Sequence, residues 1–401
     1  MHQSESDDGM ANTEQTLSHG PANRNGKLRI VNGNSNPKLA KGICKALRIP
    51  LTTCNVGTFA NGEINVKILE SIRGDDLFVV QPTCGNGVIN VNQAVMELLL
   101  IIHTLKLSSV RRVFAVIPHY GYARQDRKHT SRVPISASAV ARMIMEFGVS
   151  GVLTMDLHCG QIQGFFHGCP VADLSATSEF AEYAKSKSFD TNNLVVVAPD
   201  AGAVNRARRM GDCLGARRIV TILKRRVEAN QVDSMQLVGE VDGCTCIIVD
   251  DMIDTAGTLC KAAEVLSENG AKEVHAWATH GILTDPACQR ITDCKALVEV
   301  VVTDSLPQEE TVRKCSKIKI ISIAKLLASA INRIHSEESI EHIGEKLVEQ
   351  HDQDLISLDA LVEEGDWPQA GQRSIKRRTT APLGKPGVSE RSPASEQKQT
   401  N

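Results

Sequence analysis

Three carboxylates stand beside a turn of small residues in the segment CIIVDDMIDTAGT. Asp250, Asp251 and Asp254 follow an apolar run, and Thr255–Thr258 then open a helical pattern. Backbone N–H groups and the positive dipole end at the start of a helix bind anions. Carboxylates accept hydrogen bonds from vicinal hydroxyls, or hold a divalent cation against a polyphosphate. The segment therefore predicts a site for a phosphorylated sugar, and without a GK[ST] ending it does not match a Walker A loop.

Two further segments place metal-ligating side chains after apolar runs. Asp156 and His158 follow GVLTM and are separated by one residue, so one of them can reach a metal ion while the other orients it or binds its water. Asp200 follows LVVVA and precedes Ala-Gly-Ala at a helix start. A helix N-cap explains Asp200 alone; beside the other carboxylates, a second Mg²⁺ contact is an equal alternative.

Two basic segments also follow apolar runs, at residues 122–132 and at Lys224, Arg225 and Arg226. Charge runs are usually solvated faces, but both segments are long enough to form lids over a ligand. Phosphoryl transfer needs Lys or Arg to neutralise developing charge, together with Mg²⁺ on the triphosphate. The short polar turn FANGE has an aromatic face with amide and carboxylate partners that could hold a purine, in Phe59, Asn61 and Glu63.

From residue 27 the chain alternates short apolar runs with helical patterns, which is typical of βαβ units with parallel sheets covered on both faces. In such sheets, ligands bind beyond the carboxyl ends of the strands. There are too many strands for one sheet, so we expect two doubly wound domains, at residues 27–174 and 175–335. The expected strands are 28–31, 77–81, 111–117, 151–156, 194–199, 217–223, 244–250, 273–280 and 296–303. The expected helices are 91–105, 135–147 and 256–269.

Composition excludes several classes of protein. The net charge of −2 and the two Trp residues do not favour nucleic-acid binding. No apolar run approaches the roughly 18 residues of a membrane span, and twelve cysteines without a CxxC pair favour reduced thiols. We expect a cytoplasmic protein. Residues 1–26 and the acidic, then basic, segment 336–401 are expected to be largely disordered, with a partner-docking segment as the alternative for the second.

Taken together, these segments resemble the ribose-phosphate diphosphokinase (phosphoribosyl pyrophosphate synthetase) family. The similarity runs from about Leu28 to Arg333 and includes FANGEINVKILESIRGDD, YARQDRKHTSRVPISA, TMDLHCGQIQGFF, APDAGA, LKRRVEANQVD, VDDMIDTAGT, THGI and LPQE. The resemblance implies Mg²⁺-dependent transfer of the diphosphoryl group of ATP to the 1-hydroxyl of ribose 5-phosphate. It also implies two phosphoribosyltransferase-like domains, and dimers assembled into a homo-hexamer, alone or with paralogous subunits.

The resemblance also implies roles for individual residues. On the ATP side, Phe59, Asn61 and Glu63 would receive adenine from the neighbouring subunit, and Arg124 and Gln125 would contact the nucleotide. Mg²⁺ would be held at His158 and Asp200, and the spacing of Asp156 and His158 leads us to expect Asp156 at the metal site as well. Lys224 and Arg226 would be catalytic. The ribose hydroxyls would bind Asp250 and Asp251, and the 5-phosphate would bind Asp254, Thr255, Ala256, Gly257 and Thr258.

The sequence departs from the family pattern in two places. FANGE replaces FSNQE and keeps the three contacting side chains. Gly160 stands where regulated animal enzymes have Ser, and the segment after GFF contains His167, an apparent extra residue, and Ala172 before Asp173. This second departure bears on an allosteric phosphate or ADP site more than on catalysis. The main alternative function is a non-catalytic regulatory subunit, and a phosphoribosyltransferase is a second one; the intact basic and ATP-side segments favour the enzyme over both.

Overall fold

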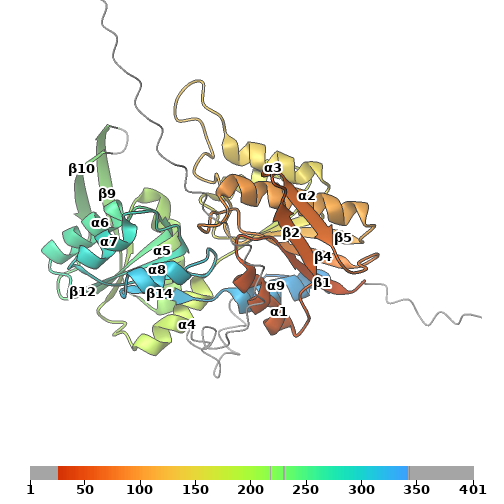
Figure 1. Ribbon diagram of the computed structural model, residues 1–401. Coiled ribbons are helices and arrows are strands. Elements are labelled where there is room, and N and C mark those ends of the chain that lie inside the picture. Colours follow the sequence, from red (N-terminus) through yellow and green to blue (C-terminus); the bar gives the residue numbers. More distant parts are fainter. Residues whose placement is uncertain (1–25, 217, 229–230, 342, 344–401) are drawn as a thin grey trace, which may run out of the picture. The chain divides into compact units, whose positions relative to one another are not determined.

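The computed structural model describes residues 26–216, 218–228, 231–341 and 343. Almost all of the two segments expected to be disordered, 1–26 and 336–401, lies outside these residues. Two sheets organise the described chain, and every strand pairing within them is parallel except the one between β9 and β10 (Figure 1). The expected α/β class with parallel sheets is confirmed.

The first sheet has the strand order β1-β4-β5-β6-β7. Its strands are β1 (Leu28–Asn32), β4 (Asp76–Val80), β5 (Arg112–Ile117), β6 (Gly151–Met155) and β7 (Val171–Leu174). A separate antiparallel hairpin consists of β2 (Cys54–Thr58) and β3 (Ile64–Ile68). The helices of this region are α1 (Pro37–Leu47), α2 (Val91–Leu107), α3 (Ser136–Glu146) and the 3₁₀ helix η1 (Gly160–Phe165).

The second sheet has the strand order β10-β9-β8-β11-β12-β13-β14. Its strands are β8 (Leu194–Ala198), β9 (Arg218–Glu228), β10 (Gln231–Val238), β11 (Thr245–Ile253), β12 (Glu273–Gly281), β13 (Leu297–Thr303) and β14 (Ile318–Ile321). Its helices are α4 (Thr177–Lys187), η2 (Ala201–Ala203), α5 (Val204–Leu214), α6 (Gly257–Glu268), α7 (Ala287–Asp293), α8 (Glu309–Lys314) and α9 (Ala324–His335).

Successive side chains of each strand point to opposite faces of its sheet, and in both sheets both faces are buried. In β4, Leu77 and Val79 pack with α2 and α3, whereas Phe78 and Val80 join a core on the opposite face. In the second sheet, the side facing α6 and α7 forms its own core. The remaining face of each sheet belongs to one shared core, which also contains α1, α4, α5 and α9. The domain division expected near residue 175 falls between β7 and α4, and it stays a prediction because the two sheets share this core.

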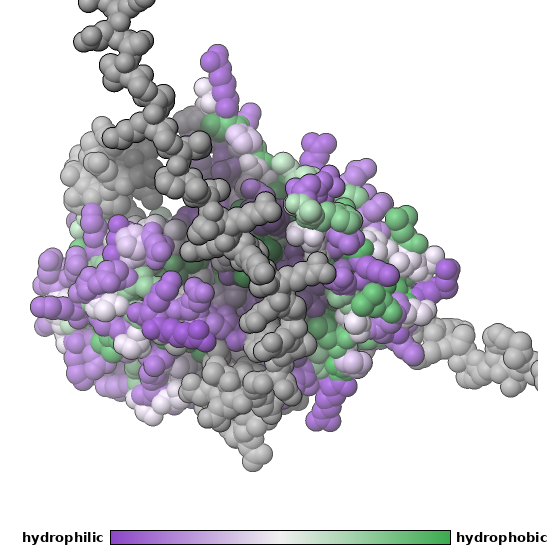
Figure 2. Space-filling model, in the orientation of Figure 1, coloured by the Kyte–Doolittle hydropathy of each residue, from purple (hydrophilic) through white to green (hydrophobic). Residues whose placement is uncertain are grey.

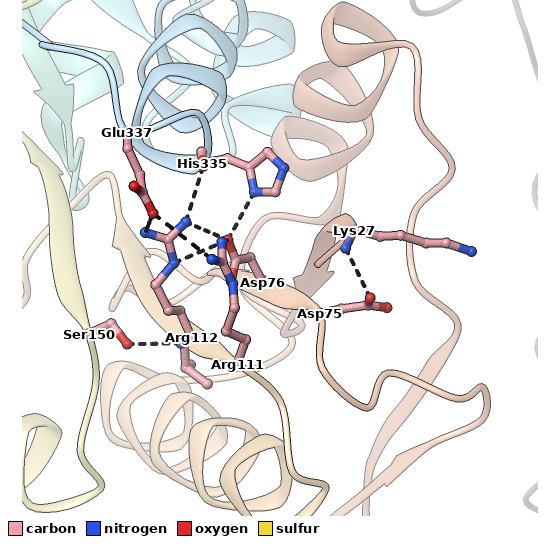
Figure 3. A network of polar contacts seen from close by, with 9 residues as sticks. Lys27, Asp75, Asp76, Arg111, Arg112, Ser150, His335 and Glu337 are labelled. Atoms are coloured by element: carbon pink, nitrogen blue, oxygen red, sulfur yellow. Dashed lines mark hydrogen bonds and ion pairs between the residues drawn. The ribbon is translucent and has the colours of Figure 1, made fainter. Parts of the chain in front are cut away.

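A buried carboxylate fastens the end of α9 to the first sheet (Figure 3). Asp76, at the start of β4, is 0% exposed and accepts hydrogen bonds from Arg111 and Arg112 at the start of β5. His335, the last residue of α9, donates from Nδ1 to the same carboxylate at 2.9 Å. Glu337 lies against both guanidiniums, with its Oε1 3.3 Å from Nη1 of Arg112. The network joins segments that are more than 200 residues apart in the chain.

The main difference from the expected elements is at β9. The apolar run predicted a strand ending at residue 223, followed by a basic loop, but β9 continues to Glu228 and pairs with β10 as an antiparallel hairpin. Ladder hydrogen bonds to β10 extend the strand through charged residues that apolar periodicity does not mark. The hairpin strands β2 and β3 and the strands β7, β10 and β14 are also absent from the expected elements.

The face of the molecule drawn in Figure 2 is largely hydrophilic, with apolar side chains in small groups. Large exposed apolar side chains in the described chain include Phe59 in the β2–β3 turn and Leu107 at the end of α2. Within the described ranges, no helix combines the length and apolar character needed to cross a bilayer.

Candidate functional site

The carboxyl end of β11 carries the paired carboxylates. Asp250 and Asp251 lie within the strand, which continues to Ile253, and not in a loop after it. The side chain of Asp251 is 6% exposed and that of Asp250 is 33% exposed. Asp251 N–H donates to the Asp250 carboxylate at 2.9 Å, so the two side chains form one acidic unit at the strand end.

His158 and Arg206 neutralise this acidic unit. Nδ1 of His158, in the loop after β6, lies 2.8 Å from Oδ2 of Asp251, and Nη1 of Arg206 lies 3.9 Å from its Oδ1. Burial opposes ionisation of Asp251, but these two partners outweigh it and hold its pKa low. Burial and the charge on Asp251 raise the pKa of Asp250. The hydrogen bond to Asp251 raises the pKa of His158, which makes it a cation at neutral pH more readily than an isolated histidine.

The small-residue turn lies directly after β11, as the sequence predicted. Ala256 is in the left-handed region with φ 57°, and Gly257 begins α6. Nη1 of Arg124, from the loop after β5, donates to Oδ2 of Asp254 at 2.7 Å. Nη1 of Arg290, in α7, donates to the carbonyl of Thr255 at 2.9 Å. The turn therefore has two cationic side chains beside it, although its own sequence has none.

The contacts of Asp156 indicate a structural role for this residue. It is 6% exposed; Oδ1 accepts from Ser175 Oγ at 3.0 Å, and Oδ2 accepts from Ala176 N–H at 2.9 Å. Oδ2 also accepts from the hydroxyl of Thr279, in β12, at 2.7 Å. Both oxygens are thus bound to protein donors, and one of these donors comes from the second sheet. The geometry favours Asp156 as a link between the sheets over its expected place beside a metal ion.

Asp200 sits at the N-cap of η2, the simpler of the two sequence interpretations. Its Oδ1 accepts from the N–H groups of Gly202 and Ala203 at 3.0 and 3.2 Å. The charge on Asp200 contributes to raising the pKa of Asp250, so the two carboxylates belong to one electrostatic neighbourhood. Among the described residues, no group of three or more His, Cys, Asp or Glu is arranged to hold a metal ion.

The expected adenine-contacting residues form the turn of the β2–β3 hairpin. Phe59 N–H donates to the Glu63 carbonyl at 2.7 Å, and Glu63 N–H donates to Asn61 Oδ1 at 3.2 Å. Phe59 is 55% exposed. The hairpin packs against α2, beside the first sheet, whereas the acidic unit lies on the second sheet. Gln125 follows Arg124 in the loop after β5 and accepts from the Ser136 hydroxyl.

The two expected catalytic cations lie in the β9–β10 hairpin. The backbone of Lys224 pairs with Met235, and that of Arg226 pairs with Val232. Their side chains are outside what the structure describes, so their catalytic role stays a prediction. In the segment that departs from the family pattern, Gly160 begins η1, and Asp173 in β7 accepts from the Leu157 N–H at 3.1 Å.

Several site residues were not identified from the sequence. Arg206 lies in the first turns of α5, and its only sequence signal was its place six residues after Asp200. His119, in the loop after β5, lines a small pocket with His158, and its ring packs 4.8 Å from that of His280. Burial lowers the pKa of both His119 and His280, so both are neutral at physiological pH. A single polar residue such as Arg206 or His119 shows no periodicity, so its place beside the site cannot be predicted from the sequence.

The chain is similar to known proteins over most of its length. Two family models match: the N-terminal domain of ribose phosphate pyrophosphokinase over residues 28–148, and the phosphoribosyl synthetase-associated domain over residues 220–344. The ribose-phosphate pyrophosphokinase of Ralstonia nicotianae is 48% identical over 314 residues, covering 78% of this chain and 96% of the relative. That of Clostridium perfringens is 47% identical, covering 79% of this chain and 98% of the relative. The crystal structure of phosphoribosylpyrophosphate synthetase from Mycobacterium smegmatis has a TM-score of 0.71 at 41% identity, over 78% of this chain and 99% of that one.

Proposed function

Because this chain belongs to the ribose-phosphate pyrophosphokinase family, we propose that it transfers the diphosphoryl group of ATP to the 1-hydroxyl of ribose 5-phosphate. The products are phosphoribosyl pyrophosphate and AMP. The observation that carries this proposal is the similarity to the pyrophosphokinases over nearly their whole length. The acidic unit of β11 and the turn before α6 support it, because together they offer partners to both ends of a phosphorylated ribose.

The sugar binds at the carboxyl end of β11. Asp250 and Asp251 accept hydrogen bonds from the ribose hydroxyls, and Arg206 and His158 keep Asp251 ionised for this role. The backbone N–H groups of the turn from Thr255 to Thr258, at the positive end of α6, bind the 5-phosphate. This placement fixes the direction of the sugar, with its phosphate at the helix and its hydroxyls at the strand.

The nucleotide side is built from the first sheet and its loops. Arg124 and His158 come from the loops after β5 and β6 and already contact the sugar-side carboxylates Asp254 and Asp251. The adenine is received by Phe59, Asn61 and Glu63 of a neighbouring subunit, and Gln125 contacts the nucleotide. The contacts between the two groups of residues support the proposal that an ATP phosphate chain lies close to a bound ribose.

The donor set fits Mg²⁺ held largely by substrate. Mg²⁺ in nucleotide sites is commonly bound by one or two protein groups together with phosphate oxygens and waters, and the described chain contains no all-protein cage. We assign His158 and Asp200 as the protein groups, with Asp156 positioning the loop that carries His158. When bound, Mg²⁺ would neutralise charge on the triphosphate.

The reaction needs no covalent intermediate. The 1-hydroxyl oxygen of the ribose attacks the β-phosphorus in line, and the bond from that phosphorus to the oxygen of the AMP leaving group breaks. The hydroxyl proton passes to solvent. Lys224 and Arg226 supply the positive charge that stabilises the transferring group. The enzyme works in the cytoplasm as a homo-hexamer built from dimers; the regulatory-subunit alternative finds no support in the names of the relatives.

The test is formation of AMP by the purified full-length chain from ATP, ribose 5-phosphate and Mg²⁺. AMP and phosphoribosyl pyrophosphate should form in equal amounts, and both should require the sugar phosphate. If the folded protein forms no AMP above background, the proposed enzymatic activity is refuted and the regulatory-subunit alternative is favoured.

A further inference from the structure

The turn Thr255–Thr258 before α6, where we propose that the 5-phosphate binds, has little positive charge of its own. Ribose 5-phosphate carries a phosphate close to dianionic at neutral pH, and the turn TAGT contains no cationic side chain. Backbone N–H groups and a helix dipole supply only about half a unit charge at such a site. A nearby cation would therefore strengthen binding of the phosphate considerably.

Arg290 lies against this turn. Its Nη1 donates to the Thr255 carbonyl at 2.9 Å, and a Cβ added at Gly257 would lie 3.3 Å from the same nitrogen. The guanidinium therefore covers the backbone between these two residues. The side chain is exposed and a guanidinium has five N–H donors, so a ligand on the turn can reach it.

The helix that carries Arg290 is held firmly to α6. Ala287 and Ile291 of α7 are 0% exposed and pack in the same core as α6. The Arg290 carbonyl accepts from the thiol of Cys260, in α6, at 3.6 Å. The guanidinium is thus presented from a fixed backbone and does not depend on a mobile loop.

The bond to Thr255 also affects the turn itself. A carbonyl oxygen that faced a bound phosphate would repel it, and the hydrogen bond from Arg290 holds this carbonyl toward α7. We propose that Arg290 is the cation of the 5-phosphate site, positioning the turn and adding charge beside the bound phosphate. This proposal deepens the proposed function and rests on it. It also predicts different effects on the two substrates, because Arg290 contacts bound ribose 5-phosphate and does not contact ATP.

The experiment compares R290Q and R290K with R313Q in the full-length chain. Arg313 is an exposed arginine in α8, so its variant makes the same charge change away from the turn. R290Q should raise KM for ribose 5-phosphate about 10- to 100-fold, which is the worth of one charge-assisted hydrogen bond. KM for ATP should stay within about twofold, and kcat should change little. R290K keeps the charge but loses the planar fork, so its KM should lie between those of R290Q and the unaltered chain.

A second readout excludes a purely structural effect. Inorganic phosphate, used as a competitor against ribose 5-phosphate, should inhibit R290Q more weakly than R313Q, while thermal unfolding of the two variants stays alike. Equal KM values for ribose 5-phosphate in R290Q and R313Q would overturn the role of Arg290, as would an equal rise in KM for both substrates. Absence of AMP formation by the unaltered chain would instead refute the proposed function.

Discussion

A carboxylate's neighbours decide whether its oxygens are open to a ligand, and Asp156 and Asp250 illustrate the two outcomes. Asp156 has both oxygens occupied by donors from Ser175, Ala176 and Thr279. Asp250 keeps a third of its side chain exposed at the strand end. The same residue type near the carboxyl end of a parallel strand is thus enclosed by protein donors in one sheet and partly exposed in the other.

The separate roles of Asp156 and His158 can be measured. In D156N, an NH₂ group replaces one oxygen and faces a donor, so the free energy of unfolding should fall by about 2 kcal/mol. The Mg²⁺ concentration for half-maximal activity should stay unchanged. H158A should raise that concentration at least tenfold, on the order of the effect of disturbing a metal site. Urea unfolding and Mg²⁺ titration of activity provide the two readouts. An equal rise in Mg²⁺ requirement in D156N would restore Asp156 as a metal ligand.

At the scale of elements, α9 and the β9–β10 hairpin have opposite relations to the rest of the chain. α9 packs against α1 and is fastened by His335 to Asp76 in the first sheet. The hairpin is an edge of the second sheet, with β10 paired only through β9 in the strand order. The described part of β10 still packs on the second sheet's core, through Met235 and Leu237. We expect α9 to contribute mainly to stability, and the catalytic role of the hairpin stays a proposal.

Asp76 should contribute to stability in a pH-dependent way. Burial opposes its ionisation, but hydrogen bonds from Arg111, Arg112 and His335 lower its pKa to about 2. A lowered pKa stabilises the folded state above the unfolded pKa of about 4, and the effect is lost as pH falls toward 2. D76N should lower the free energy of unfolding by about 3 kcal/mol at pH 7, because the partly buried cations around it lose the one fully buried carboxylate that they share.

The measurement is urea unfolding between pH 3 and pH 8. The difference between the unaltered chain and D76N should be constant above about pH 5 and should shrink below pH 4. D212N, at an exposed position in α5, serves as the control and should show no such difference. A D76N difference that does not change with pH would contradict the ionised state of Asp76.

Lys224 tests the catalytic role of the hairpin. K224A should lower kcat about 10²- to 10³-fold, as expected for loss of a group that stabilises charge only in the transition state. The KM values for both substrates should change little, because ground-state binding does not use this contact. K295A removes an exposed lysine elsewhere on the second-sheet region and should retain full activity. An unchanged kcat in K224A would remove Lys224 from the mechanism.

At the scale of the whole molecule, one site draws on distant parts of the chain. Asp251 and Asp254 on the second sheet pair with His158 and Arg124 from the first. The shared core holds the sheets together beneath these contacts. The hairpin that carries Phe59 packs against α2, whereas the acidic unit lies on the second sheet. This separation agrees with the proposal that Phe59 contacts the adenine bound by a neighbouring subunit.

The proposed sharing of sites between subunits predicts complementation. F59A should impair the expected adenine contact and K224A should impair the expected catalytic step, so each variant alone should have low activity. In the proposed hexamers, formed by co-expression, some sites should combine an intact Phe59 from one subunit with an intact Lys224 from another, so activity should rise well above that of either variant. Activity measured on the purified mixed assembly gives the result, and a mixture no more active than its parts would show that each chain forms its own site.

The sequence by itself determined the family, the α/β class, the sugar-phosphate segment 246–258 and the strands that deliver it. These features depend on local apolar periods and on ordered motifs, which a linear reading preserves. The tertiary structure decided the partners of Asp156, the positions of Arg206 and Arg290 beside the site, the core shared by the sheets and the pairing that extends β9. Each of these depends on contacts between residues far apart in the chain, and such contacts leave no local pattern. The lysine-free turn is the clearest case, because the two cations beside it, Arg124 and Arg290, come from other segments of the chain.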